Sequence, residues 1–168
     1  MAGRDPAELT EVSVSLPFGI GSAKWKADPT EREAAWELYV ELVTRVAVQP
    51  LPDGVGTVRE AMNSLYSLFA STREILRDAG PKVGASRDSV GGIAIAVLNK
   101  GLRPFLSKWH PELQAWEAIK RDNVSPKAHE QDWELEPQAR GELEVLRKKL
   151  AQYASELAKI AGIKGKNI

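Results

Sequence analysis

Cysteine is absent from the 168-residue sequence, and histidine occurs only at His110 and His129. Without thiols the chain can form no disulfide and no thiolate metal site, and it has no cysteine nucleophile. Two histidines without a His-Glu-x-x-His pattern make no zinc motif. We therefore expect no metal and no cofactor, and the lack of cysteine is typical of a reducing compartment such as the cytoplasm.

An excess of charge of one sign is also missing. Lysine and arginine together number 23, and aspartate and glutamate also number 23, so the formal net charge is zero. No overall field draws the protein toward nucleic acid or an anionic membrane, although a local basic patch such as 147–149 is compatible with this balance. We expect a protein partner or self-association, and nucleic acid is the less favoured alternative.

Long hydrophobic runs do not occur. The longest apolar stretch, 93–98, is far shorter than the about 20 residues of a membrane-spanning helix. The first residues show no apolar run after a basic start, so we expect no secretory signal and a cytoplasmic protein. Hydrophobic residues make up 43% and charged residues 27% of the chain, which is typical of a folded globular protein.

Three segments follow from the pattern along the chain: an N-terminal arm over 1–27, a helical bundle over 28–162 and a basic tail over 163–168. In the arm, residues 10–16 alternate polar and apolar side chains, which predicts a half-buried strand. Residues 23–26, around Trp25, form a weak candidate for its partner strand. The fold class that we expect is all-α, a four- to five-helix bundle with a short N-terminal β arm or hairpin.

Apolar steps of three and four predict the helices of the bundle. Their expected ranges are 29–48, 57–79, 91–98, 111–121 and 139–160. Asp28 before Pro29 and Thr57 before Glu60 are typical helix starts, and Ser86 or Ser89 opens the third helix. That third helix has no polar side chain in its body, so we expect it to be central.

Glycines and prolines predict the interruptions. Gly91 and Gly92 cost about 1 kcal/mol each in a helix, a loss that is tolerable if neighbouring backbones approach closely there. Gly101 and Pro104 predict a kink or break between 100 and 104, and Pro111 predicts a second boundary at His110. Residues 122–136 are expected to be the longest irregular connection.

The last helix carries a heptad pattern. Its central leucines are Leu143, Leu150 and Leu157, in a series of apolar residues spaced alternately by four and three, which is the spacing of knobs-into-holes packing. Such a seam serves either the bundle or a second chain. Because further apolar residues widen this face, we favour packing within the bundle, while the leucines stay candidates for partner binding.

The stretch 101–116 gathers most of the residues that can carry chemistry. These are Arg103, Lys108, Trp109, His110 and Trp116. The spacing of Arg103 and His110, with six residues between them, resembles the Arg and His signature of the HEPN superfamily, small helical bundles that include many RNases of bacterial toxin and defence systems. The resemblance implies that Arg103 stabilises the transition state and that His110 transfers a proton, without a metal.

Pro104 departs from that family, because a polar residue usually follows the arginine. The structural alternative is that the tryptophans fill the end of the bundle, that His110 caps a helix and that Arg103 pairs with a carboxylate. Trp133, in an acidic segment, and Trp25, in the arm, either pin their segments to the domain or anchor a partner.

These observations favour a non-enzymatic interaction or regulatory subunit, which assembles with itself or with a larger complex. Few residues are capable of catalytic chemistry. The last helix has an apolar seam suited to assembly, and the β arm has little function in an isolated monomer. The candidate partner-binding residues are Trp25, Trp109, Trp116, Trp133, Leu143, Leu150 and Leu157. The alternative is a HEPN-like RNase, or a toxin or defence component, that uses Arg103 and His110.

Overall fold

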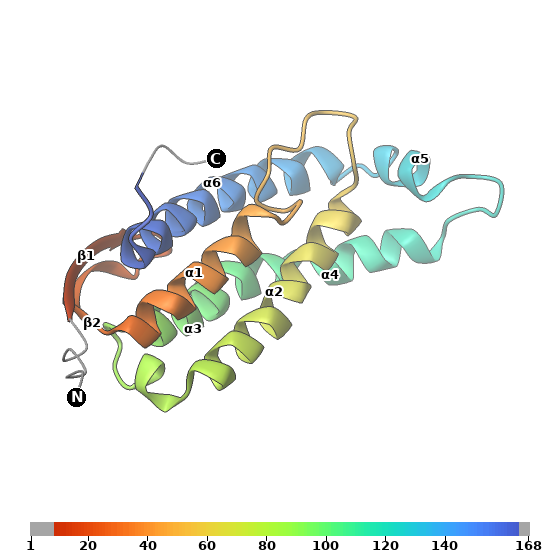
Figure 1. The fold of residues 1–168 in the computed structure, drawn as a ribbon. Coiled ribbons are helices and arrows are strands. Elements are labelled where there is room, and N and C mark those ends of the chain that lie inside the picture. Colours follow the sequence, from red (N-terminus) through yellow and green to blue (C-terminus); the bar gives the residue numbers. More distant parts are fainter. Residues whose placement is uncertain (1–8, 165–168) are drawn as a thin grey trace, which may run out of the picture.

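The computed structural model describes residues 9–164, and helices dominate it. Its elements are β1 (Thr10–Leu16), β2 (Gly21–Ala27), α1 (Pro29–Val43), α2 (Val58–Ala79), the 3-10 turn η1 (Pro81–Gly84), α3 (Val90–Val97), the π turn η2 (Leu98–Leu102), α4 (Arg103–Ala118), α5 (Pro126–Gln131) and α6 (Glu136–Ala161). The long helices lie side by side, and the β hairpin crosses one end of them (Figure 1). The expected helical bundle with a short β arm is confirmed.

The predicted strand and its weak partner form an antiparallel hairpin in which Val12 lies opposite Trp25. Alternate residues of β1 are buried, as the period of two predicted. The hairpin closes with positive φ at Phe18 and Gly19, +61° and +70°, and the Ile20 N–H donates to the Pro17 carbonyl. These are the features of a type I′ turn. A phenylalanine rarely takes this conformation, and here its ring packs on Gly101, where a Cβ would come within 2.8 Å of it.

Helix α1 ends at Val43, earlier than the predicted residue 48. The Thr44 hydroxyl donates to the Val40 carbonyl at 2.7 Å, and the Gln49 side chain donates to the Val43 carbonyl at 2.7 Å. Side chains thus satisfy carbonyls of the last turn that a longer helix would have used. The apolar residues after α1 still enter the core, because Ala47 and Val48 are buried in the following turn.

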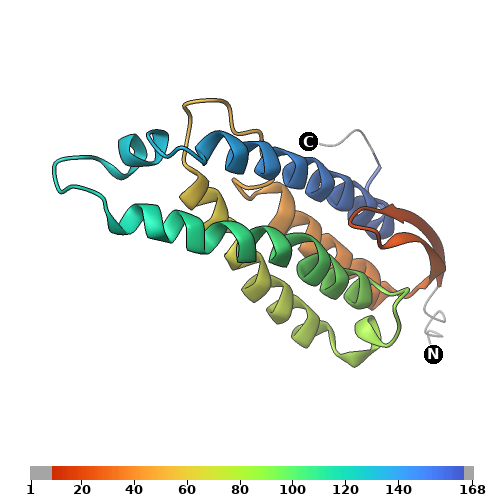
Figure 2. The same cartoon turned by 180° about the vertical axis from the view of Figure 1, so that it is seen from behind.

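Of the kink or break expected between 100 and 104, the break is wrong and the irregular turn η2 lies there instead, and the boundary expected at His110 is also wrong. From α3 through η2 to α4 the backbone stays helical, as the long green helix in Figure 2 shows. The Arg103 N–H donates to the Leu98 carbonyl, so the helix widens by one residue just before Pro104, which has no N–H to offer. Pro111 lies inside α4 on its exposed side, where water can bond the carbonyl that it leaves free.

Two further expectations have mixed outcomes. The segment 122–136 is not wholly irregular, because it contains α5, whose N-terminus is capped by the Ser125 hydroxyl. Close approach at the glycine pair is confirmed. A Cβ on Gly91 would lie 2.5 Å from the Val83 carbonyl oxygen, and one on Gly92 would lie 2.2 Å from the Ser86 carbonyl oxygen. The backbone of η1 and the loop after it therefore packs directly on α3.

The heptad seam of α6 faces the interior of the same chain. Leu143, Leu150 and Leu157 are buried in the hydrophobic core. Helix α6 runs antiparallel to α1, because Arg32 near the start of α1 donates to the Ile160 carbonyl at the end of α6. The seam therefore packs within the bundle, as its broad apolar face predicted.

Candidate functional site

Five of the seven candidate partner-binding residues lie in the core. Each is at most 5% exposed: Trp109, Trp133, Leu143, Leu150 and Leu157. The two indoles meet edge to face with ring centroids 5.9 Å apart, and the Trp109 Nε1–H donates to Glu142 at 2.7 Å. As the chain folds here, these side chains pack against one another and against the core, and they offer no surface to a partner.

The other two tryptophans are half-buried, and each holds a segment in place. The Trp25 Nε1–H donates to the buried Glu31 carboxylate at 3.2 Å, which fastens the hairpin to the start of α1. Trp116 stacks on His129 with ring centroids 4.5 Å apart, and its Nε1–H donates to the His129 carbonyl at 2.7 Å. Trp116 therefore joins α4 to α5.

Arg103 and His110 both face α2, but they have different neighbours. The Arg103 guanidinium lies over the Phe69 ring, 5.1 Å from its centroid, and its Nε–H donates to Asn99 at 3.2 Å. The structural expectation of a carboxylate partner for Arg103 is wrong, because Asn99 takes that place. The His110 ring meets Tyr66 edge to face at 5.5 Å, and its Nδ1 lies 3.4 Å from the Arg59 guanidinium.

His110 does not cap a helix that starts at Pro111, because α4 continues through it. Arg103 and His110 are seven positions apart in one helix, which places them on one face and about 10.5 Å apart along the axis. The two side chains therefore both contact α2, but their contacts are with different residues.

The two helices meet in a regular seam. On α2, the residues at seven-residue steps are Arg59, Tyr66 and Arg73; on α4, they are Glu117, His110 and Arg103. The Arg59 guanidinium holds Glu117 with two hydrogen bonds of 2.7 and 2.8 Å, Tyr66 meets His110, and Arg73 and Arg103 both lie over Phe69. We call these six side chains the α2–α4 seam. Sequence reasoning singled out Arg103 and His110 but missed the α2 half, although its seven-residue spacing was visible.

An exposed apolar surface on α1 was also missed. Trp36 is 49% exposed and Val40, one turn later, is 37% exposed. We call these two residues with the half-buried Val43 the α1 patch. Beside it, a groove of about 470 Å³ runs between α1 and α6, with Tyr39 and Ala151 among its lining residues. The sequence indicated that α1 is apolar over much of its circumference but not which part stays uncovered.

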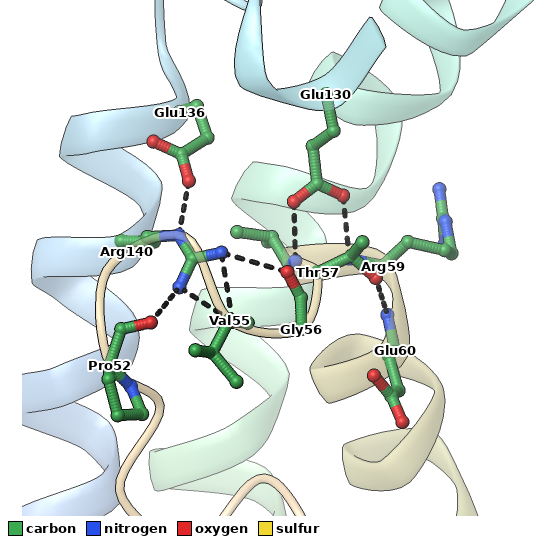
Figure 3. Close-up of polar contacts among 10 residues, drawn as sticks. Pro52, Val55, Gly56, Thr57, Arg59, Glu60, Glu130, Glu136 and Arg140 are labelled. Carbon is green, nitrogen blue, oxygen red and sulfur yellow. Dashed lines mark hydrogen bonds and ion pairs between the residues drawn. The ribbon is translucent and has the colours of Figure 1, made fainter. Parts of the chain in front are cut away.

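The N-terminal ends of α2 and α6 are joined by polar contacts with the loop before α2 (Figure 3). Arg140 pairs with Glu136 and donates to the carbonyls of Pro52, Val55 and Gly56. A cleft of about 510 Å³ lies beside this junction and is lined by both acidic and basic side chains. Because Arg140 already bonds the loop, the junction is a structural clamp.

Glu130 from α5 caps the start of α2 in the same region. Its carboxylate accepts the Val58 N–H at 2.6 Å and the Arg59 N–H at 3.1 Å (Figure 3). Burial nevertheless raises the pKa of Glu130 above its ordinary value, because the loss of water outweighs the stabilising backbone hydrogen bonds. The start of α2 therefore depends on a carboxylate that is costly to ionise.

Over the described residues 9–164, no three or more His, Cys, Asp or Glu side chains are grouped so that they could hold a metal ion. In the same part of the chain, no helix is long and apolar enough to cross a membrane.

Comparison of the chain with protein-family models, with curated proteins and with solved structures gave no match.

Proposed function

We propose that this chain is a non-enzymatic interaction subunit that associates with a second copy of itself through the α1 patch. The observation that carries the proposal is the exposure of Trp36 and Val40 on consecutive turns of one helix beside an open groove. Aromatic side chains are enriched in the centres of protein interfaces, where each buries a large area. An exposed tryptophan grouped with valines is therefore a candidate contact surface.

Charges around the patch favour a second copy as the partner. Glu33 and Glu37 lie within one turn of Trp36 on α1 and are exposed. On α6, Lys148 is exposed one turn before Gln152, which lines the groove. Because α1 and α6 are antiparallel neighbours, a copy related by a two-fold axis can bring its acidic rim over the basic rim of the first. Opposite charges then face each other on both sides of the interface.

The test is the mass of the protein in solution over a range of concentrations, by sedimentation equilibrium or light scattering. We expect a dimer for the wild type and a monomer for Trp36→Glu. Val145→Glu is the matched control, because Val145 is 55% exposed on α6 but does not line the groove. A wild type that is monomeric throughout, or a Trp36→Glu variant with the mass of the wild type, would contradict the proposal.

An RNase that uses Arg103 and His110 is the second candidate. Both residues lie on the same face of α4, and Arg103 has no carboxylate partner among the described residues, which leaves its guanidinium free to bind a phosphate. The test is cleavage of a labelled single-stranded RNA by the purified protein, with His110→Ala as the variant. Cleavage that His110→Ala leaves unchanged, or no cleavage by the wild type, excludes this candidate.

A further inference from the structure

The α2–α4 seam has two different ends. At one end, the Arg59 guanidinium donates two hydrogen bonds to the Glu117 carboxylate, and the two opposite charges neutralise each other. At the other end stand two arginines, Arg73 and Arg103, and no carboxylate lies within ion-pair distance of either one among the described residues. The same row of contacts between α2 and α4 is thus neutralised by an ion pair at one end and left positive at the other.

The positive end is held in a fixed arrangement. The guanidinium carbons of Arg73 and Arg103 lie 5.7 and 5.1 Å from the centroid of the same Phe69 ring, so the two are no farther apart than the sum of these distances. The Arg103 Nε–H donates to Asn99, which orients the guanidinium and leaves its terminal N–H groups available. Stacking on a ring limits the freedom of both side chains, and this reduces the entropy lost when they bind an anion.

We propose that the Arg73–Arg103 end of the seam binds a carboxylate from an acidic segment of a partner protein. The far end of the seam shows the chemistry: there a carboxylate, that of Glu117, accepts two hydrogen bonds from an arginine of α2, as an incoming glutamate or aspartate would from Arg73 or Arg103. Arginine is well suited to this role, since its planar fork binds both oxygens of a carboxylate. Exposed Tyr66 and the adjacent His110 ring give the segment a surface to lie on between the two ends.

The unpaired positive region is short, and its surroundings are of mixed charge. Beyond the two arginines, the seam continues with the Tyr66–His110 ring pair and then with the neutralised Arg59–Glu117 pair. On the turns next to Arg73 and Arg103, the basic Arg77 and Lys100 are exposed together with the acidic Glu74 and Asp78. A phosphate backbone needs a series of cations along its path, whereas one or two carboxylates need only one such pair. The zero net charge of the chain agrees with this limit.

This inference is independent of the proposed self-association, because the α1 patch lies on other helices. The test measures fluorescence anisotropy of a short labelled peptide of alternating Glu and Ser with the full-length protein. A peptide with Gln in place of Glu and a labelled single-stranded RNA of similar length are the comparison probes. The variant is Arg73→Gln with Arg103→Gln, and circular dichroism checks that it folds as the wild type does.

The charge-matched control is Arg87→Gln with Arg121→Gln, because both of those arginines are exposed and lie outside the seam. We expect the Glu peptide to bind, the Gln peptide to bind about tenfold more weakly, and the seam variant to lose about tenfold or more in affinity while the control keeps the wild-type value. No binding of the Glu peptide, an equal loss in both double variants, or tighter binding of the RNA at the same site would overturn the proposal. A change in the mass of the seam variant would instead concern the proposed self-association.

Discussion

Helices α1 and α6 pack against each other, and both carry wide apolar surfaces, but they use them differently. Helix α6 has the regular heptad pattern of an assembly helix, and its leucines are all buried in its own chain. Helix α1 has a less regular pattern, yet it leaves Trp36 and Val40 uncovered. Helix α6, whose pattern is typical of assembly, therefore packs within its own chain, and the α1 patch lies on the neighbouring helix.

The difference shows what periodicity does and does not specify. A heptad pattern predicts that one face of a helix is buried, but another helix of the same chain and a second chain can bury that face equally well. Apolar width beyond that face is more informative. Once α2, α3 and α6 cover one side of α1, Trp36 and Val40 stay partly exposed, although Trp36 stacks on Tyr39 of the same helix.

The difference between α6 and α1 is tested most directly by truncating one leucine of α6 and one valine of α1. Leu150 is fully buried, so we expect Leu150→Ala to lower the free energy of unfolding by about 2–5 kcal/mol. Val40→Ala, on the exposed side of α1, should change it by less than about 0.5 kcal/mol. Denaturant unfolding of both variants measures this. A large loss in Val40→Ala would mean that the α1 patch is covered, and a small loss in Leu150→Ala would mean that the α6 seam is not.

Buried and more exposed carboxylates are also expected to differ in what they contribute to the free energy of unfolding. Glu130→Ala leaves the buried Val58 N–H and its neighbour without an acceptor, so we expect a loss of about 1–3 kcal/mol in the free energy of unfolding. The pKa of Glu130 is raised in the folded chain, so from its ordinary value of 4.5 upward the folded state binds more protons than the unfolded state. Stability contributed by this group is therefore present at low pH and is lost as pH rises through the folded pKa.

Glu130→Gln isolates that pH dependence, since it cannot ionise. The stability of the wild type minus that of Glu130→Gln should fall with rising pH. Glu142 on the outer side of α6 should give the opposite slope, because the hydrogen bond from Lys108 lowers its pKa, so its contribution is present above the ordinary value and is lost as pH falls. Slopes of the same sign for the two glutamates would refute this assignment.

Two helical glycines extend the comparison to the backbone. Gly101→Ala places a Cβ within 2.8 Å of the Phe18 ring, so we expect a loss of about 1–3 kcal/mol from overpacking. Gly141→Ala on α6 meets no atom within 4 Å and should gain about 0.5–1 kcal/mol, because alanine favours a helix. Thermal unfolding of both variants measures these changes in stability. A stabilising effect of Gly101→Ala would show that the turn at Phe18 is free to move.

A small effect is also expected at Tyr153, on the inner face of α6. Its hydroxyl is buried and has no hydrogen-bond partner among the described residues, and burial raises its pKa far above the ordinary value. Tyr153→Phe should therefore leave stability unchanged or raise it by up to about 1 kcal/mol, since the uncompensated hydroxyl is removed. A clear loss in chemical denaturation would show that the hydroxyl is bonded after all.

Local chemistry in the sequence was enough to predict much of the fold. The period of two marked β1, side-chain caps marked the starts of α1 and α2 at Asp28 and Thr57, and the heptad marked the buried face of α6. Each of these signals depends only on residues close together in the chain. For that reason the sequence by itself determined where β1, α1, α2 and α6 form and which of their faces are apolar, but not α5 or the continuous helix from α3 to α4.

Contacts between distant segments decided the rest. The prolines at positions 104 and 111 do not break the helix. The turn before Pro104 is widened, and the carbonyl that Pro111 leaves without an N–H donor is exposed to water. The α2–α4 seam exists only because antiparallel packing brings Arg73 to Arg103 across Phe69. Which apolar face stays uncovered and which charge stays unpaired depend on what the other helices cover, and residue spacing along one helix carries no information about that.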